Sequence, residues 1–206
     1  LFAACFHNNG QTCAALKRLY VHEEIYDEVC QEMARLAKAV KVGNGEEEGV
    51  ELGPLQNAKQ LAIVMDLAAD AKANGGIFLA GGNKIPGNGY FFEPTIVAGL
   101  SDGSRLVDEE PFGPIVPIIK YNDIDAVIAS ANNNQSGLGG SVWSKDVAKA
   151  TMLASRLECG SAWVNTHGAI QPNAPFGGVK QSGFGVEFGL YGLEEYTSIQ
   201  TLRIPK

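Results

Sequence analysis

A single cysteine in this sequence has neighbours that suit a nucleophile. Cys13 ends the run FHNNGQTC, in which a glycine and polar side chains precede the thiol. A thiol attacks as its thiolate, so it needs a partly exposed position that is rich in N–H donors. The Gly-Gln-Thr segment before Cys13 provides backbone N–H groups that would also hold an oxyanion formed on a substrate carbonyl. These residues therefore predict that Cys13 is a nucleophile directed at a carbonyl group.

The other cysteines are predicted to be structural thiols. Cys30 follows a valine inside a helical pattern, Cys159 precedes a glycine, and Cys5 lies in an apolar run. The four cysteines show no C-x-x-C pair and no spacing typical of metal ligands, so no metal site is expected. A core of this size needs no disulfides, which favours free thiols in a reducing compartment and a cytoplasmic location.

Histidines leave a second kind of chemistry open. His7 lies a few residues before Cys13, and His167 lies in a loop after an expected strand. Either ring would make a Cys–His dyad, and such a dyad would indicate a hydrolase. Neither spacing is diagnostic, and the sequence favours the alternative interpretation, in which both histidines are ordinary polar loop residues.

Two further segments contain acids beside rigid or glycine-rich turns. Residues 108–115 (DEEPFGPI) place two glutamates before a Pro-Phe-Gly-Pro turn, which suits either an acceptor for ligand hydroxyl groups or a solvated acidic loop. Residues 173–189 (NAPFGGVKQSGFGVEFG) form either a loop at the mouth of a site or a flexible connection. Because no complete phosphate-binding motif occurs, we do not expect the chain alone to form a whole dinucleotide-binding unit.

The pattern of apolar residues predicts the elements that position these segments. Strands and helices alternate, which indicates an α/β fold with a mostly parallel sheet whose active edge lies at the carboxyl ends of the strands. Pro117 inside an expected strand predicts an edge position or a bulge, and the alternating tail at 194–206 predicts an exposed strand. Helices are expected at 23–40, 59–74, 123–133 and 145–157, and strands at 17–21, 76–82, 115–121, 139–144 and 160–165.

Composition excludes several classes of protein. The 206 residues carry a formal net charge of −7, with 23 acidic against 16 basic side chains, and no basic cluster offers a nucleic-acid surface. No apolar run approaches the roughly 18 residues of a membrane span. Hydrophobic residues make up 45% of the chain, enough for one large domain or two small ones. Because the sequence opens at Leu1 on an apolar run, we expect a piece of a longer chain.

Four motifs follow one another in an order that resembles the aldehyde dehydrogenase superfamily. They are FHNNGQTC, EEPFGP, PFGGVKQSG and EFGLYGLEEYT, and the similarity runs over essentially all 206 residues. The resemblance implies the C-terminal half of such an enzyme, with a three-layer α/β/α catalytic domain at 1–193 and an oligomerisation strand at 194–206. It also implies that the general-base glutamate, the oxyanion-hole asparagine and the Rossmann-like cofactor domain lie outside these residues. The chain alone is therefore expected to be inactive.

The resemblance assigns roles to individual residues. It implies that Cys13 is the nucleophile, that Glu110 binds the hydroxyl groups of the nicotinamide ribose and that Phe112 lies beside the nicotinamide. Gln60 corresponds to a position that contacts the cofactor ribose in some members, and Glu187 corresponds to a glutamate of a proton relay. The positions that line the aldehyde tunnel are His167, Ile170 and Phe176.

The implied reaction is the NAD- or NADP-dependent oxidation of an aldehyde to a carboxylic acid through a cysteine thiohemiacetal and thioester. The implied partners are a small aldehyde and further copies of the chain in a dimer or tetramer, with neither nucleic acid nor membrane. Pro111 replaces the branched residue that is usual before the phenylalanine, and it stiffens the turn. Two other functions stay open from the residues alone: a stand-alone cysteine hydrolase that uses His7 or His167, and a non-catalytic assembly module.

Overall fold

The computed structural model describes all 206 residues, and the chain divides into two compact units. The first unit comprises residues 1–130 and the second comprises residues 131–206. The division falls inside the helix α5 (Ile124–Asn132). The single catalytic domain that the sequence predicted at 1–193 spans this division.

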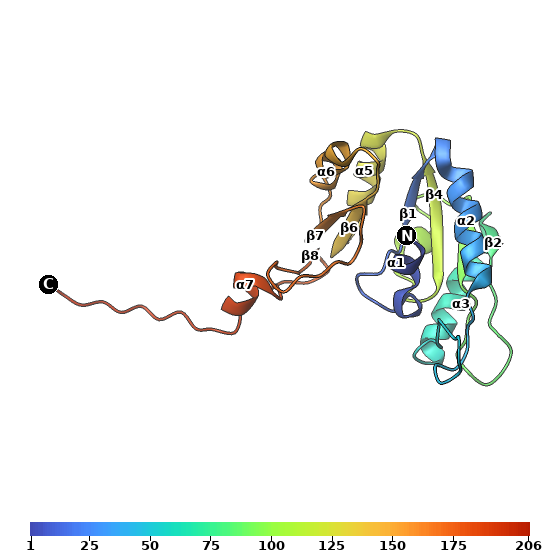
Figure 1. Cartoon of the computed structure of the whole chain (residues 1–206), viewed down its shortest axis with the longest axis horizontal. Coiled ribbons are helices and arrows are strands. Elements are labelled where there is room, and N and C mark those ends of the chain that lie inside the picture. The colour runs from blue at the N-terminus through green and yellow to red at the C-terminus, as the bar shows by residue number, and fades with distance from the viewer. The chain divides into compact units, whose positions relative to one another are not determined.

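The first unit is built on a four-stranded sheet with the order β1-β4-β3-β2. Figure 1 labels β1, β4 and β2 of this sheet. Both pairs that involve β4 are parallel, whereas β2 pairs with β3 in the antiparallel sense. The strands are β1 (Leu19–His22), β2 (Ile77–Ala80), β3 (Thr95–Ala98) and β4 (Ile115–Tyr121). The helices are α1 (Phe2–Phe6), α2 (Tyr26–Ala39), α3 (Ala58–Ala73) and α4 (Arg105–Asp108), with 3₁₀ turns at His7–Gly10 and Glu23–Ile25.

Alternating side chains of this sheet build two hydrophobic cores, one on each face. Val116 and Ile118 of β4 pack into the core that α2 covers. Ile115 and Ile119 of the same strand pack into the other core, together with α3 and α4. Because successive side chains of a strand point to opposite faces, the first unit has three layers, α/β/α. The predicted α/β fold class with a mostly parallel sheet is confirmed.

Two features of this sheet differ from the sequence prediction. Pro117 was expected at an edge or a bulge, but β4 lies between β1 and β3. Pro117 is the last residue of β4 in register with β3, and the pairing with β1 begins at the next residue, Ile118. The missing N–H group therefore falls where β4 changes partners, which is compatible with a central strand. No strand was expected at β3, because a run of four residues that are all buried has no alternation to detect.

Local signals set the ends of the two long helices of this unit. Asn57 caps α3, since its side-chain oxygen accepts a hydrogen bond from Gln60 N at 2.9 Å. The helix α2 has acidic side chains in its first turn and Lys38 in its last turn, the order that the helix dipole favours. This helix begins later than the predicted residue 23 because the 3₁₀ turn Glu23–Ile25 occupies its expected first residues.

The second unit contains two small sheets. β6 (Gly139–Val142) and β7 (Ser161–Val164) are parallel, and α6 (Val147–Ala154) connects them and packs on both. β5 (Ser136–Gly137) and β8 (Val179–Lys180) form an antiparallel pair. The strand–helix–strand order predicted for this part of the chain is confirmed. After α7 (Gly189–Glu194) the chain runs on as an extended segment (Figure 1).

The tail at 194–206 does not form the predicted strand within this chain. Glu194 is the last residue of α7, and the residues after it form turns and irregular backbone. The apolar side chains of the tail are open to solvent, with exposed fractions of 100% at Ile199 and 83% at Leu202. A strand needs a hydrogen-bonding partner, and no strand of this chain pairs with the tail. An oligomerisation strand at this position stays a prediction that requires a second chain.

Candidate active site

Cys13 lies in the loop that leads from the first 3₁₀ turn into β1. Within this loop, Ala15 N donates a hydrogen bond to Thr12 O at 2.9 Å and closes a turn around the cysteine. The Cys13 side chain is exposed and forms no disulfide. Three consecutive residues with positive φ angles of 49°, 61° and 73° reverse the chain just before the loop: Asn8, Asn9 and Gly10. The thiol is therefore presented on an exposed turn, as its predicted role requires.

The glycine at the start of this loop lies against a second loop that is distant in the sequence. A Cβ atom on Gly10 would come within 2.3 Å of the Gly113 carbonyl oxygen, so the two backbones touch where no side chain fits. Gly113 in turn packs on α3, since a Cβ atom there would lie 2.5 Å from Val64 Cγ2. The Cys13 loop and the Pro-Phe-Gly-Pro turn are thus in direct backbone contact.

Gln11 fastens the Cys13 loop to the segment that precedes α3. Its side-chain amide donates through Nε2 to Pro54 O at 3.2 Å and accepts through Oε1 from Gln56 N at 2.8 Å. The cap of α3, Asn57, follows directly in the sequence. Because both ends of the amide are used, the loop is held in one position relative to α3.

Lys17 joins the Cys13 turn to Glu110. Its Nζ atom forms an ion pair with Glu110 Oε1 at 2.9 Å and donates to the carbonyl oxygens of Thr12 at 2.8 Å and Cys13 at 3.2 Å. The ammonium also lies 5.4 Å from the centroid of the Phe112 ring. Three residues predicted from the sequence, Cys13, Glu110 and Phe112, are therefore brought together around one lysine. Sequence reasoning missed this lysine, and the only available signal was its place shortly after the predicted nucleophile.

Gln60 holds the Glu110 turn from the side of α3. Its Nε2 atom donates to Pro111 O at 2.8 Å. The next residue, Phe112, has a φ angle of 44°, which is uncommon for a bulky side chain. Gln60, which the sequence predicted as a ribose contact, thus lies beside the Glu110 turn, and its amide nitrogen is used to hold that turn.

The two adjacent glutamates of this turn have different partners. Glu109 Oε1 forms an ion pair with Arg105 Nε at 2.7 Å, and Arg105 also binds Asp66 at 3.0 Å. The hydrogen bond from Arg105 lowers the pKa of the Glu109 carboxyl group. Glu110 instead pairs with Lys17. Only the second glutamate is therefore joined to the Cys13 turn.

The Cys13 and Glu110 loops lie at the opposite edge of the sheet from the one that the sequence predicted for the site. Cys13 precedes β1 and Glu110 precedes β4, and these strands are parallel with Leu19 opposite Ile118. Both loops therefore meet at the amino ends of the strands and not at the carboxyl ends. The rule that favours carboxyl ends concerns loops that leave the strands of a doubly wound sheet, whereas both of these loops enter a strand.

The other three cysteines lie deeper in the protein. Cys5 is 1% exposed and Cys30 is 6% exposed, which confirms that both are structural thiols. Burial raises the pKa of the Cys5 thiol to about 12 and also raises the pKa of Cys30. Burial likewise raises the pKa of Cys159, whose thiol donates to Ser161 O at 3.2 Å.

Alkylation by iodoacetamide at about pH 8 is expected to modify Cys13 first. Only the thiolate reacts, and burial and raised pKa values keep the other three thiols protonated, so each of them should react more slowly than Cys13. A time course analysed by digestion and mass spectrometry gives the rate for each cysteine. Faster labelling of Cys30 or Cys159 in the folded protein would contradict the assignment of Cys13 as the reactive thiol.

In the second unit, backbone hydrogen bonds connect two residues whose roles were predicted from the sequence, Phe176 and Glu187. Phe176 N donates to Glu187 O, and Glu187 N donates to Phe176 O, both at 2.8 Å. The Glu187 side chain is exposed, and the Tyr196 hydroxyl donates to its Oε1 atom at 3.3 Å. A glutamate predicted for a proton relay thus lies next to a residue predicted for the substrate pocket. Tyr196 is a contact that sequence reasoning missed.

His167 and Ile170 lie in the segment after β7. His167 Nδ1 is 3.0 Å from Ser141 Oγ, and its ring packs edge-on against Trp163 with centroids 4.9 Å apart. Ile170 is 46% exposed. Because these residues belong to the second unit and Cys13 to the first, their roles toward Cys13 stay predictions.

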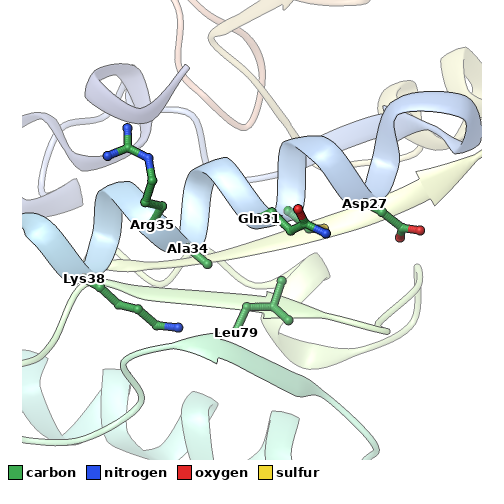
Figure 2. A pocket seen from close by; sticks show the side chains of 7 residues that line it. Asp27, Gln31, Ala34, Arg35, Lys38 and Leu79 are labelled. Carbon is green, nitrogen blue, oxygen red and sulfur yellow. The ribbon is translucent and has the colours of Figure 1, made fainter.

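A surface cavity lies elsewhere in the first unit, along α2. It has a volume of about 580 Å³ and is bounded by one face of α2 and by Leu79 of β2, as Figure 2 shows. The cavity shares no residue with the Cys13 loop or the Glu110 turn, and it is lined by Asp27, Cys30, Gln31, Ala34, Arg35, Lys38 and Leu79. No group of three or more His, Cys, Asp or Glu side chains is placed to hold a metal ion, and none of the helices combines the length and apolar character that a membrane span requires.

The sequence and the fold that position Cys13 are shared with known proteins. The sequence matches the aldehyde dehydrogenase family over residues 1–202. The chain belongs to this family. The resemblance that the four motifs indicated is thereby confirmed at the level of the aldehyde dehydrogenase family.

Individual aldehyde dehydrogenases extend well beyond this chain. Phenylacetaldehyde dehydrogenase from Pseudomonas fluorescens is 40% identical over 204 residues, which are 98% of this chain and 41% of that protein. Human aldehyde dehydrogenase 1A1 is 39% identical over 97% of this chain and 40% of its own length. The NAD+ complex of an aldehyde dehydrogenase from Bacillus cereus matches 96% of this chain and 40% of its own, with a TM-score of 0.92 and 36% identity. This chain therefore spans about two fifths of the length of these relatives.

Proposed function

We propose that this chain carries the nucleophile and part of the cofactor site of an NAD- or NADP-dependent enzyme that oxidises aldehydes to carboxylic acids. The observation that supports this most directly is the cluster around Lys17. It joins Cys13, an exposed thiol suited to a carbonyl substrate, to Glu110, a carboxylate suited to cofactor hydroxyl groups, although the two are far apart in the sequence.

The chemistry begins at Cys13. As a thiolate it attacks the aldehyde carbon and forms a C–S bond, and the carbonyl electrons move to the oxygen of a thiohemiacetal. Backbone N–H groups of the turn would stabilise that oxyanion. Loss of a hydride from the same carbon leaves a thioester on Cys13, and water then releases the carboxylic acid. The nicotinamide, when bound, supplies the hydride acceptor.

The residues around Glu110 suit a ribose diol and an aromatic ring. Lys17 holds Oε1 of this carboxylate, and the Glu110 side chain is 52% exposed, so Oε2 is open to hydroxyl donors. Phe112 places an aromatic ring near the same ammonium. Gln60 keeps a side-chain oxygen that its bond to Pro111 leaves unused. We therefore assign Glu110, Phe112 and Gln60 to the cofactor site.

The second unit contains the residues that we assign to the proton relay and to the aldehyde pocket. Glu187 has an exposed carboxylate that accepts a hydrogen bond from Tyr196, which suits a group that receives a proton and passes it on. The side chains that we assign to the aldehyde pocket are His167, Ile170 and Phe176, and the backbone bonds between Phe176 and Glu187 support a shared place for pocket and relay.

The exposed tail supports the assembly that we propose, and the free cysteines support the location. Ile199 and Leu202 in the tail are 100% and 83% exposed, and a second copy of the chain would cover such apolar side chains. This supports a homo-oligomer, either a dimer or a tetramer. None of the four cysteines forms a disulfide, which supports a reducing compartment such as the cytoplasm.

A stand-alone cysteine hydrolase is less well supported. It needs an imidazole within hydrogen-bond reach of the Cys13 thiol. The His7 ring is exposed and makes no hydrogen bond, and the His167 ring contacts Ser141 within the second unit. Assays of the product of the complete reading frame separate the two functions. Aldehyde-dependent formation of NADH or NADPH supports the dehydrogenase, whereas ester hydrolysis without any cofactor reduction supports the hydrolase.

Replacement of Glu110 by glutamine is expected to weaken cofactor binding and slow hydride transfer about ten- to hundredfold, because a hydrogen bond to a charged group is worth about 1.5–3 kcal/mol. The KM for the aldehyde should change much less. Stopped-flow measurement of NADH formation and a titration with NAD+ give the two constants.

Glu109→Gln is the matched control for this substitution. It removes the same charge from the neighbouring residue, but Glu109 pairs with Arg105 and not with Lys17. Hydride transfer and NAD+ affinity should stay near those of the unsubstituted protein. Equal effects of the two substitutions would mean that only the charge of the loop matters, and Glu110 would then be a solvated loop residue.

A further inference from the structure

We infer that Lys17 is a positioning residue of the proposed dehydrogenase, which fixes the cofactor carboxylate of Glu110 relative to the turn that carries Cys13. The inference rests on the proposed roles of Glu110 and Cys13. It goes further because neither the sequence motifs nor the family resemblance assigns a role to Lys17.

The ammonium group of Lys17 uses all of its hydrogen-bonding capacity. An ammonium has three hydrogens, and Nζ lies 2.9 Å from Glu110 Oε1, 2.8 Å from Thr12 O and 3.2 Å from Cys13 O. A further contact of 3.4 Å reaches Ala15 O. The carbonyl groups all belong to the Cys13 turn, whereas the carboxylate belongs to the loop before β4. One cation therefore binds both loops, and separating them breaks a charged hydrogen bond.

The Lys17 ammonium lies in partly buried surroundings, where Glu110 is the carboxylate that pairs with it. Only 16% of the Lys17 side chain is exposed, compared with 52% of the Glu110 side chain. A cation in such a position requires acceptors, and Glu110 is the carboxylate that forms an ion pair with it. The Phe112 ring at 5.4 Å adds a cation–π contact. A neutral, apolar side chain at position 17 would leave the carboxylate and the carbonyl groups of the turn without their donor.

The two oxygen atoms of the Glu110 carboxylate have different roles in this arrangement. Oε1 is held by Lys17, and Oε2 stays open for the hydroxyl groups of a ribose. Without Lys17 the flexible side chain would occupy several rotamers, and ordering it when the cofactor binds would cost free energy. Lys17 orders the carboxylate beforehand and keeps it close to the nucleophile. The loss of Lys17 should therefore weaken cofactor binding through Glu110.

A double-mutant cycle in the product of the complete reading frame tests this. The variants are Lys17→Met, Glu110→Gln and the combination of both, together with Lys17→Arg. Lys145→Met is the matched control, because Lys145 is an exposed lysine without an ion pair. The Kd for NAD+ is measured by calorimetry without aldehyde, and thermal unfolding shows whether each variant is folded. If Lys17→Met does not fold, Lys17→Gln takes its place, since an amide still donates to the carbonyl groups of the turn.

We expect the effect of substituting Lys17 on the Kd for NAD+ to depend on the presence of Glu110. Lys17→Met should raise the Kd for NAD+ about three- to tenfold, because a charge-assisted hydrogen bond to a half-exposed carboxylate is lost. Lys17→Arg should restore most of the affinity, since a guanidinium also donates to a carboxylate. In the Glu110→Gln background, Lys17→Met should not raise the Kd further, whereas a merely structural lysine would act additively.

Two results would overturn the inference: additive effects of the two substitutions, or a Kd for Lys17→Met equal to that for Lys145→Met. A protein in which the two substitutions are non-additive, as expected, but which oxidises no aldehyde would support the role of Lys17 in cofactor binding and refute the proposed reaction. An unsubstituted protein that binds neither NAD+ nor NADP+ would refute both.

Discussion

In the product of the complete reading frame, replacement of Cys13 by alanine should abolish the proposed aldehyde oxidation, with a loss in kcat of about four orders of magnitude or more. A methyl group forms no bond to the aldehyde carbon, and none of the other three cysteines has an exposed side chain that could replace the thiol. Because Cys13 belongs to neither hydrophobic core, the free energy of unfolding should change by about 0.5 kcal/mol or less. Initial rates of cofactor reduction and a urea titration measure the two effects.

Cys159→Ala is the matched control for the nucleophile. Cys159 is partly accessible like a reactive thiol, but it lies in the second unit and burial raises its pKa. The variant should keep its activity. Retained oxidation in Cys13→Ala, or a loss confined to Cys159→Ala, would place the nucleophile elsewhere.

Replacement of Gly10 by alanine should lower the free energy of unfolding by about 2–5 kcal/mol, the sum of about 1–2 kcal/mol for a left-handed alanine and about 1–3 kcal/mol for overpacking. The φ angle of Gly10 is +73°, and a Cβ atom would lie 2.3 Å from the Gly113 carbonyl oxygen. The two loops must therefore move apart to admit a methyl group. Equilibrium unfolding in urea measures the loss, and the proposed aldehyde oxidation by the product of the complete reading frame should also be slower.

Gly103→Ala separates the two contributions to this loss. Gly103 has a φ angle of +90°, but no atom lies within 4 Å of a Cβ placed on it. The substitution should therefore cause only the conformational strain of about 1–2 kcal/mol. The difference between the two variants measures the contact between the Cys13 loop and the Pro-Phe-Gly-Pro turn. Equal losses at both positions would contradict that contact.

Features that depend on neighbouring residues could be predicted from the sequence. Cys13 differed from the other cysteines by the polar, glycine-containing run before it, and its exposure agrees with that prediction. The strand β4 has the predicted bounds, Ile115–Tyr121, because its apolar run ends at a clear turn signal. Asp123 accepts a hydrogen bond from Ala126 N at 2.7 Å, as expected of a helix cap. In each case the physical cause lies within a few residues.

Predictions about strand partners were less successful, because pairing depends on other parts of the protein. Pro117 was assigned to an edge, although the change of partner at Ile118 allows a proline in the central strand. The tail after Glu194 alternates like a strand, but no strand within the chain pairs with it. Alternation shows which side chains share a face, and it does not show whether a neighbouring strand exists.

The meeting of the Cys13 turn with Glu110 could not be found in any single segment. Glu109 and Glu110 are equivalent in the sequence, and they differ because one faces Arg105 and the other faces Lys17. Which glutamate faces the Cys13 turn depends on the register of β1 against β4, with Leu19 opposite Ile118. That register is set when the side chains of both strands pack into the two cores of the first unit. Local motifs therefore identify the reactive residues, whereas long-range packing places them together.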